Sequence, residues 1–334
     1  MADGQVAGNG RSTAERVADW EEAPGVVEGA LEIELSPHDC DIEFWVQSVA
    51  QGTLKGLVHG RKPDSTVPDF LRQDGPLRQT LIEECSFRSI SEEYATKACG
   101  LTSAAGQNTM QVEFFATQCL DEARHSYTFR HHLVDLGVPE DQLAATVEAA
   151  ARENADRILK PTWDWGVKAY KSDFASGVVI ITVLLEGVLA PTTELAERKW
   201  KAISPATADI ERGACVDEVR HLAVGSWFIK DHLERNPDDK PRILELIMEG
   251  REFWGSLPVP ELIAQRETLF QQGIEELGDL IGDAEIVEGR RLVDTTVEER
   301  LGMALEWSQE VQDARLRYMG LEDAIPQAAA DVAR

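Results

Sequence analysis

Hydrophobic positions recur every three or four residues along most of the chain, as they do in helices that bury one face. Period-two alternation of β-branched residues, which is typical of strands, is scarce. The sequence therefore predicts an all-α protein. The expected helices cover residues 42–58, 74–100, 105–136, 140–160, 165–200, 204–233, 240–253, 259–280 and 296–319.

Several helix boundaries carry local signals. Ser204 followed by Pro205 suits an N-cap and the first turn of a helix. Thr296 and Glu299 have the spacing of a capping box. Lys160-Pro161 permits a break or a kink, because proline removes a backbone donor.

No linker divides the chain convincingly, so we expect a single domain over residues 16–325, with a four-helix core and additional helices around it. The polar, small-residue ends over 1–15 and 326–334 are predicted to be disordered. Hydrophobic residues make up 43% of the 334 residues, which is enough for a sizeable core.

The net charge of −27 disfavours nucleic acid as a partner, because the 60 acidic residues outnumber the 33 basic ones and repel phosphate. Most of this acidity is interpreted as a solvated surface. The five cysteines form no C-x-x-C pair, and the N-terminus lacks the features of a signal peptide. We therefore expect reduced thiols and a cytoplasmic protein. The apolar run from Val178 to Ala190 is shorter than the ~20 residues that span a bilayer, so no membrane partner is expected.

The same five-residue motif, D-E-x-R-H, occurs twice, at 121–125 and at 217–221, each time inside a predicted helix. Residues three apart share a face of a helix, so Glu122 and His125 can point at one spot, as can Glu218 and His221. Of the seven histidines, only these two follow a glutamate by three residues. The repeated motif therefore predicts a two-metal site between helices.

Such a site needs one more glutamate from each of two other helices. Glu186 suits one position, because it interrupts an apolar run in which a lone carboxylate is costly to bury. The other position falls at Glu92 or Glu93. We prefer Glu93 and keep Glu92 as the alternative, since neighbours on a helix point about 100° apart and only one can face inward.

Four glutamates and two histidines suit iron or manganese rather than structural zinc. Asp121 and Asp217 are candidate acceptors that would orient the histidines, and Arg124 and Arg220 are candidate partners of these acids. The competing interpretation is that both motifs lie on solvated, charged helix faces and that their histidines are incidental.

Over roughly residues 80–235, the order Glu93, Glu122, His125, Glu186, Glu218, His221 resembles the ferritin-like di-iron carboxylate proteins. These include ribonucleotide reductase small subunits, the ligand-binding oxidases related to them, and the hydroxylase subunits of bacterial multicomponent monooxygenases. The doubled motif and Glu93-Tyr94 look most like the hydroxylases. The stretches 124–138 and 184–194 look more like the oxidases.

The resemblance implies a ferritin-like four-helix bundle that holds two iron ions, or manganese and iron, and uses O₂ to oxidise a small molecule. Hydroxylation or N-oxygenation is implied, as in the stand-alone di-iron oxygenases of natural-product pathways. It also implies a homodimer and a separate electron donor, a ferredoxin or a reductase, because no flavin, nicotinamide or iron–sulfur motif is visible in the sequence.

The chain departs from each subfamily at a characteristic position. Phe129 stands where the reductase subunits place their radical tyrosine, and Ile181 stands where the oxidases place a crosslinked tyrosine. Ala190 replaces a monooxygenase threonine, and Ala214 replaces a third histidine of arylamine oxygenases. Two alternatives to an oxygenase stay open: a radical-generating reductase subunit, and an iron-storage or metal-binding scaffold.

The aromatic residues Trp163, Trp165 and Tyr170 are interpreted as core residues, with the wall of a pocket as the alternative.

Overall fold

The structure, a computed structural model, describes residues 11–54 and 59–326. Most of this part is helical. Its one sheet among the described residues is a two-stranded antiparallel hairpin of β1 (Glu285–Val287) and β2 (Arg290–Arg291). The prediction of an all-α protein is confirmed.

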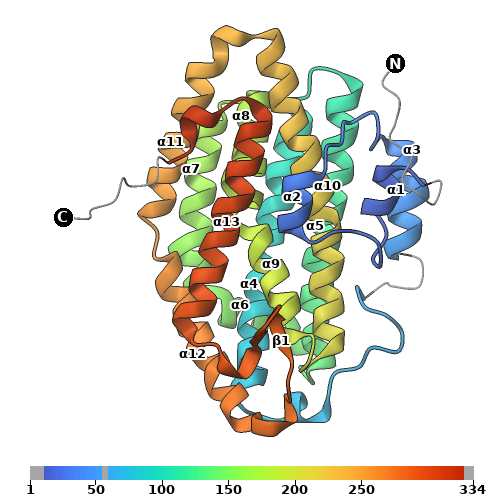
Figure 1. Cartoon of the computed structure of the whole chain (residues 1–334), viewed down its shortest axis with the longest axis vertical. Helices are drawn as coiled ribbons and strands as arrows, with labels where there is room; N and C mark the ends of the chain where they lie inside the picture. The colour runs from blue at the N-terminus through green and yellow to red at the C-terminus, as the bar shows by residue number, and fades with distance from the viewer. Residues whose placement is uncertain (1–10, 55–58, 327–334) are drawn as a thin grey trace.

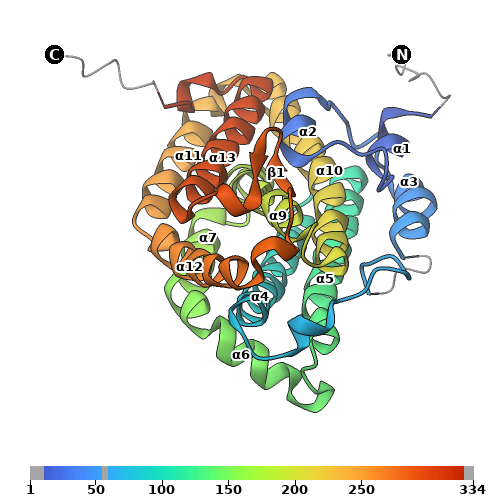
Figure 2. The same cartoon turned by 60° about the horizontal axis from the view of Figure 1, so that its bottom comes forward.

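Four long helical segments form the centre of the molecule (Figures 1 and 2). The first two, α4 and α5, pack along their lengths, and the third and fourth pack against each other beside them. The third segment is continuous but consists of three parts, with the π-helical η5 between two α-helices. The segments are α4 (Pro76–Ala104), α5 (Thr109–Asp135), α8–η5–α9 (Phe174–Val178, Val179–Glu186, Gly187–Trp200) and α10 (Pro205–Arg235).

Further helices surround this centre. Helix α12 packs against α4, α13 against α9 and α10, and α11 against η5. In both views α1 and α3 lie on the opposite side of the molecule from α11 and α12 (Figures 1 and 2). The flanking helices are α1 (Thr13–Val17), α2 (Val26–Glu32), α3 (Ile42–Phe44), η1 (Trp45–Leu54), α6 (Leu143–Asn154), η4 (Ala155–Leu159), α7 (Lys160–Tyr170), α11 (Lys240–Gly255), α12 (Val259–Leu277) and α13 (Val297–Met319). Short 3₁₀ turns cover Asp69–Arg72, Glu140–Gln142, Pro237–Asp239, Gly278–Leu280, Leu292–Asp294 and Glu322–Ala324.

The predicted caps form. The Ser204 hydroxyl accepts a hydrogen bond from the Thr207 amide at the start of α10. Thr296 and Glu299 make the full capping box of α13. No break occurs at Lys160-Pro161, because α6 continues through the π-helical η4 into α7, where Pro161 occupies the first turn.

One predicted helix is wrong. The stretch 165–200 is not continuous, because the chain turns between α7 and α8, where Lys171 and Ser172 have φ of 50° and 56°. Asp173 then caps α8 by accepting a hydrogen bond of 2.8 Å from the Ser176 amide. A local polar turn therefore overrides the helical periodicity on both sides of it.

The predicted disorder over 1–15 is also wrong for the last residues of this range. Helix α1 begins at Thr13, and Ser12 and Glu15 form a capping box. Residues 1–10 and 327–334 lie outside the described residues. The predicted helix 42–58 is observed as α3 and η1 up to Leu54, and 55–58 lie outside the described part.

Two aromatic groups fill the bundle on either side of its middle. Phe174 meets Phe115 and Phe228 edge to face in one of them, and all three ring centroids lie 5.5–6.0 Å apart. Trp200 and Phe270 meet in the other, 5.2 Å apart. The segment Phe174–Trp200 is long and apolar enough to span a membrane by composition alone, but 83% of its most apolar window is buried inside the protein, as expected of a core helix.

Candidate metal centre

The two D-E-x-R-H motifs face each other across the bundle, one on α5 and one on α10. Their glutamates and histidines are all buried. The alternative interpretation, that these residues lie on solvated helix faces, is therefore wrong. The i, i+3 spacing places each glutamate and histidine on the inward face of its helix.

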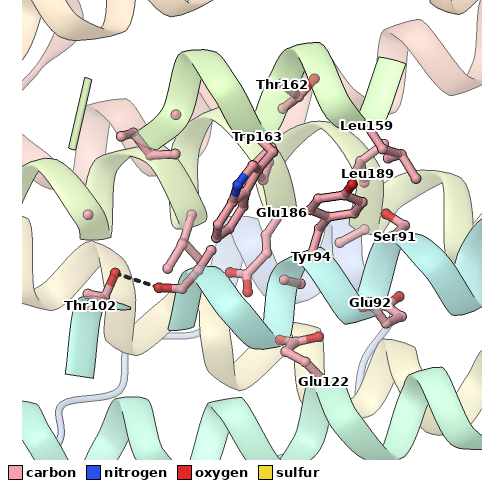
Figure 3. A pocket seen from close by; sticks show the side chains of 18 of the residues that line it. Ser91, Glu92, Tyr94, Thr102, Glu122, Leu159, Thr162, Trp163, Glu186 and Leu189 are labelled. Atoms are coloured by element: carbon pink, nitrogen blue, oxygen red, sulfur yellow. Dashed lines mark hydrogen bonds between the residues drawn. The ribbon is translucent and has the colours of Figure 1, made fainter. Parts of the chain in front are cut away.

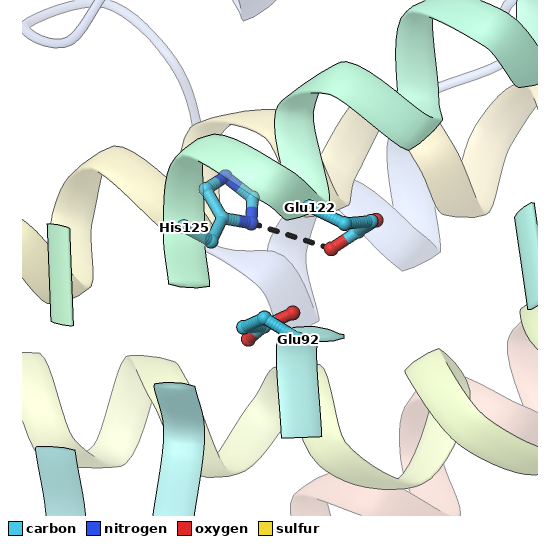
Figure 4. A group of neighbouring side chains, drawn as sticks. All are labelled: Glu92, Glu122 and His125. Atoms are coloured by element: carbon cyan, nitrogen blue, oxygen red, sulfur yellow. Dashed lines mark ion pairs between the residues drawn. The ribbon is translucent and has the colours of Figure 1, made fainter. Parts of the chain in front are cut away.

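Glu122 is shared by two groups of potential metal ligands. Ligand atoms of Glu92, Glu122 and His125 all lie within 4.8 Å of one another, and so do those of Glu122, Glu186 and His221. Figure 4 shows the first group, with Glu92 of α4 facing Glu122 and His125 of α5. A carboxylate that belongs to both groups can bridge two neighbouring ions.

Glu92, not the preferred Glu93, belongs to this centre. The Glu93 side chain is half exposed, and its Oε1 lies 3.1 Å from Arg130 Nη1 on the outside of the bundle. The roughly 100° between neighbouring helix positions turns Glu93 outward when Glu92 faces Glu122. The choice of Glu93 is thus corrected to Glu92.

The other two glutamates also point inward. Glu186 is the last residue of η5, whose π-helical winding is of a kind often found at functional sites. It accepts a hydrogen bond from Gln118. Glu218 Oε2 lies 4.0 Å from His221 Nδ1, so this glutamate borders the second group.

Each histidine is held by the aspartate of the opposite motif. His125 Nε2 lies 3.1 Å from Asp217 Oδ2, and His221 Nε2 lies 3.4 Å from Asp121 Oδ2. A carboxylate at Nε2 accepts the Nε2 proton and turns Nδ1 toward the glutamates. The expected contacts between aspartates and histidines are observed, but the sequence did not predict that each aspartate would contact the histidine of the other helix.

Buried cations hold the two aspartates in turn. Arg220 Nη2 lies 2.5 Å from Asp121 and 2.9 Å from Asp217, and Arg124 also pairs with Asp217. Trp45 Nε1 donates to both carboxylate oxygens of Asp121, at 3.1 Å. These contacts lock both aspartates in place, and the expected pairing of the arginines with them is observed.

Burial and charge perturb the ionisation of this centre. Burial raises the pKa of Glu186 to about 8, against the opposing charge of His221. Burial also raises the pKa of Glu92 and of Glu218, and neighbouring carboxylates raise both further. Burial would lower the pKa of His125, but the hydrogen bond to Asp217 and the nearby Glu122 carboxylate outweigh this effect and raise that pKa to about 10. A proton or a cation bound among these crowded carboxylates is therefore stabilised.

The residues fit a pair of divalent cations. Within the described part of the chain, five buried atoms of the candidate ligands form no hydrogen bond of good geometry, although His125 Nδ1 lies 3.4 Å from Glu122 Oε2 and His221 Nδ1 lies 3.2 Å from Glu122 Oε1. They are Glu122 Oε1, His125 Nδ1, Glu186 Oε2, Glu218 Oε2 and His221 Nδ1. Buried polar atoms normally have hydrogen-bond partners, so these five, which gather around Glu122, indicate a ligand that they share. Carboxylate oxygens and imidazole nitrogens suit iron or manganese.

Two residues that contact the candidate centre were not predicted from the sequence. Gln118 lies one turn before Glu122, and this spacing was the only signal that could have indicated it. Trp45 comes from a separate helix near the N-terminus, and no local pattern connects it with Asp121.

Substitution of Asp217 by asparagine is expected to weaken metal binding about 10- to 100-fold. The neutral amide accepts the His125 Nε2 proton less strongly than the charged carboxylate does, so it holds the imidazole less firmly. Isothermal titration with Mn(II) would measure this effect. Asp209→Asn, at an aspartate of α10 that bonds Ser65 away from the centre, is the matched control and should bind like the wild type. Equal affinity of all three proteins would contradict the orienting role.

A cavity adjoins the centre (Figure 3). Its volume is about 1110 Å³, part of it open to solvent, and the four glutamates 92, 122, 186 and 218 all line it. Aromatic side chains form much of its wall, among them Tyr94, Trp163, Tyr170 and Trp254. Trp163 and Tyr170 therefore line a pocket, the alternative left open by the sequence, whereas Trp165 stacks on Phe253 with ring centroids 5.2 Å apart.

A comparison with known proteins found no family model and no curated sequence that matches the chain. The chemistry of the centre is accordingly argued from its own geometry.

Proposed function

We propose that this protein is an O₂-dependent oxidoreductase in which a ferritin-like bundle holds two iron ions, or manganese and iron, beside a substrate cavity. The observation that carries the proposal is that the buried Glu122 belongs to both ligand groups, which four helical segments assemble. Carboxylates in pairs with E-x-x-H motifs from opposing helices are the ligand arrangement of di-iron carboxylate bundles.

The residues divide into two ion sites around Glu122. Glu92 and His125 would hold one ion, and Glu186, Glu218 and His221 would hold the other. Four ionised glutamates balance the charge of two divalent ions, which makes their burial tolerable. When bound, two ferrous ions would supply open coordination positions and electrons for the reduction of O₂.

The protein itself would bind the substrate, orient the metal ligands and exclude bulk water. The hydrogen bonds that the imidazoles donate to Asp217 and Asp121 fix the direction of the rings. The apolar wall of the cavity keeps bulk water from the centre and binds a small-molecule substrate. Hydroxylation or N-oxygenation is the proposed reaction class, with electrons from a separate ferredoxin or reductase.

Two observations favour an oxygenase over the alternatives. Phe129, one turn after His125, is buried and has no hydroxyl with which to form a radical of the reductase type. The cavity that the four glutamates line has aromatic walls, which suit an organic substrate better than a growing mineral.

Anaerobic loading with Fe(II) followed by exposure to O₂ tests the proposal. We expect O₂ uptake in proportion to bound iron, with neither a persistent tyrosyl radical in the electron paramagnetic resonance spectrum nor a growing ferric mineral. A persistent radical would favour a reductase-like role, mineral growth would favour storage, and bound iron that is inert to O₂ would contradict the proposal.

Metal binding is expected to release protons and to strengthen as pH rises. Without metal, Glu186 with a pKa of about 8 and His125 with a pKa of about 10 hold protons at neutral pH, and an ion must displace them. Titration with Mn(II) between pH 6 and 9, in buffers of different ionisation enthalpy, measures both effects. An affinity that does not change over this range would be inconsistent with these ionisation states.

A further inference from the structure

Helix α5 carries an apolar stripe on its outer side. Between Val112 and Tyr127 this helix has five exposed positions, and none of them is charged. They are Val112, Ala116, Leu120, Ala123 and Tyr127, of which Leu120 is 51% exposed. Their spacing of three and four residues keeps them on one face of the helix. In a chain with 28% charged residues and a net charge of −27, a continuous apolar stripe indicates a surface for association.

The stripe reads nearly the same in both directions. Leu120 stands at its middle, an alanine lies three or four residues to either side, and a larger residue lies at each end. A two-fold axis at Leu120 would therefore pair the stripe with an antiparallel copy of itself. Ala116 and Ala123 are small enough to let two such helices approach closely, because the distance between packed helices depends on the side chains at the contact.

A contact between α4 and α5 fixes which residues of the two helices lie at the same level. Cys119 Sγ donates a hydrogen bond to the Thr96 carbonyl oxygen. The two helices are antiparallel, so one step further along α5 corresponds to one step back along α4. Leu120 therefore lies level with Ala95.

Two opposite charges lie symmetrically about this level on α4. Glu93 is two residues before Ala95, Lys97 is two residues after it, and both side chains are exposed. Glu93 faces the α5 side of its helix, since its Oε1 lies 3.1 Å from Arg130 Nη1. Lys97 follows one turn later on the same face. A two-fold axis at the level of Leu120 would bring Glu93 of each copy opposite Lys97 of the other, so the charges of two identical chains are complementary.

We propose that a second copy of this chain covers this face, with α5 packed antiparallel on α5 and α4 on α4 around a two-fold axis at Leu120. Burial of the stripe supplies most of the free energy, and the paired charges fix the register. Two strongly acidic chains can meet here because the stripe itself is uncharged. The proposal assigns a specific surface to the homodimer that the resemblance implies, and it does not rest on the proposed function.

The oligomeric state of the full-length, metal-free protein tests the proposal. Analytical ultracentrifugation should show a dimer for the wild type. Leu120→Glu should raise the dissociation constant at least about 100-fold, because it removes two leucines from the interface and places two carboxylates near the axis. Leu305→Glu, at a leucine of α13 that is 65% exposed, is the matched control and should dimerise like the wild type.

Charge exchange tests the register. Lys97→Glu makes both positions acidic and Glu93→Lys makes both basic, so each variant should dimerise about 10-fold more weakly than the wild type in low salt. A mixture of the two variants restores both ion pairs, and native mass spectrometry should show the mixed dimer well above half of the total. Lys201→Glu, which makes the same change of charge at an exposed position directly after α9, should leave the dimer unchanged.

A monomeric wild type would overturn the proposal and leave the stripe to a different partner. A dimer that survives Leu120→Glu, or a mixed dimer at only the statistical half of the total, would refute the antiparallel pairing. Circular dichroism separates loss of the dimer from loss of the fold, and the charge variants test the interface even if Leu120→Glu does not fold. Every measurement is made without metal, so failure of the proposed function would leave these results unaffected.

Discussion

Replacing Glu122 by alanine is expected to lower the metal content from about two ions per chain to fewer than one. Glu122 is the only glutamate that belongs to both ligand groups of the described centre, so its removal takes a ligand from each ion at once. It also leaves Glu92, Glu186 and Glu218 with less bound positive charge to offset their mutual repulsion. Elemental analysis of protein expressed with added iron measures the outcome.

Glu93→Ala is the matched control, because Glu93 lies one position after Glu92 on the same helix but faces Arg130 at the surface. It should keep the full metal content, whereas Glu92→Ala should lose an ion. The assignment of the first ligand would be reversed if Glu93→Ala lost metal and Glu92→Ala did not. Full occupancy in Glu122→Ala would rule out a shared carboxylate.

Replacing Arg220 by methionine is expected to produce the largest loss of stability, about 3–5 kcal/mol in the free energy of unfolding. The Arg220 guanidinium is buried and lies between Asp121 and Asp217. Methionine fills much of the space but leaves two buried carboxylates without their shared cation. Chemical denaturation of the metal-free protein, followed by circular dichroism, measures the difference.

Arg235→Met on the same helix serves as the comparison. Arg235 is 62% exposed and pairs with Asp231 at the surface, so its loss should cost less than about 1 kcal/mol. Similar effects of the two substitutions would show that the buried network around Arg220 contributes little to stability. Metal loading should in addition raise the stability of the wild type more than that of Arg220→Met, since displaced aspartates no longer orient the histidines.

The sequence predicted most helices because their apolar faces repeat with the helical period and because polar caps mark their ends. It failed at Lys171 and Ser172, where two residues in the left-handed region reverse the chain inside an otherwise helical pattern. Short helices such as α1 also escaped prediction, because a five-residue helix contains too few turns for periodicity to be visible.

The candidate centre was largely predictable for a different reason. Glu186 is conspicuous in an apolar run, and the repeated motif identifies the glutamates and histidines of α5 and α10. Glu92 and Glu93 have similar surroundings in the sequence, and only the rotation of α4 decides which faces inward. Contacts between distant segments, such as the hydrogen bond from Trp45 to Asp121, depend on the assembled fold and leave no local pattern.

The central claim is that carboxylates and imidazoles from four helical segments hold two metal ions around Glu122. Metal analysis of the iron-loaded wild type, combined with X-ray absorption at the iron edge, tests it most directly. The claim predicts about two ions per chain, bound by oxygen and nitrogen, with a second metal detected next to each ion. A single ion per chain, or two ions with no metal neighbour, would contradict it.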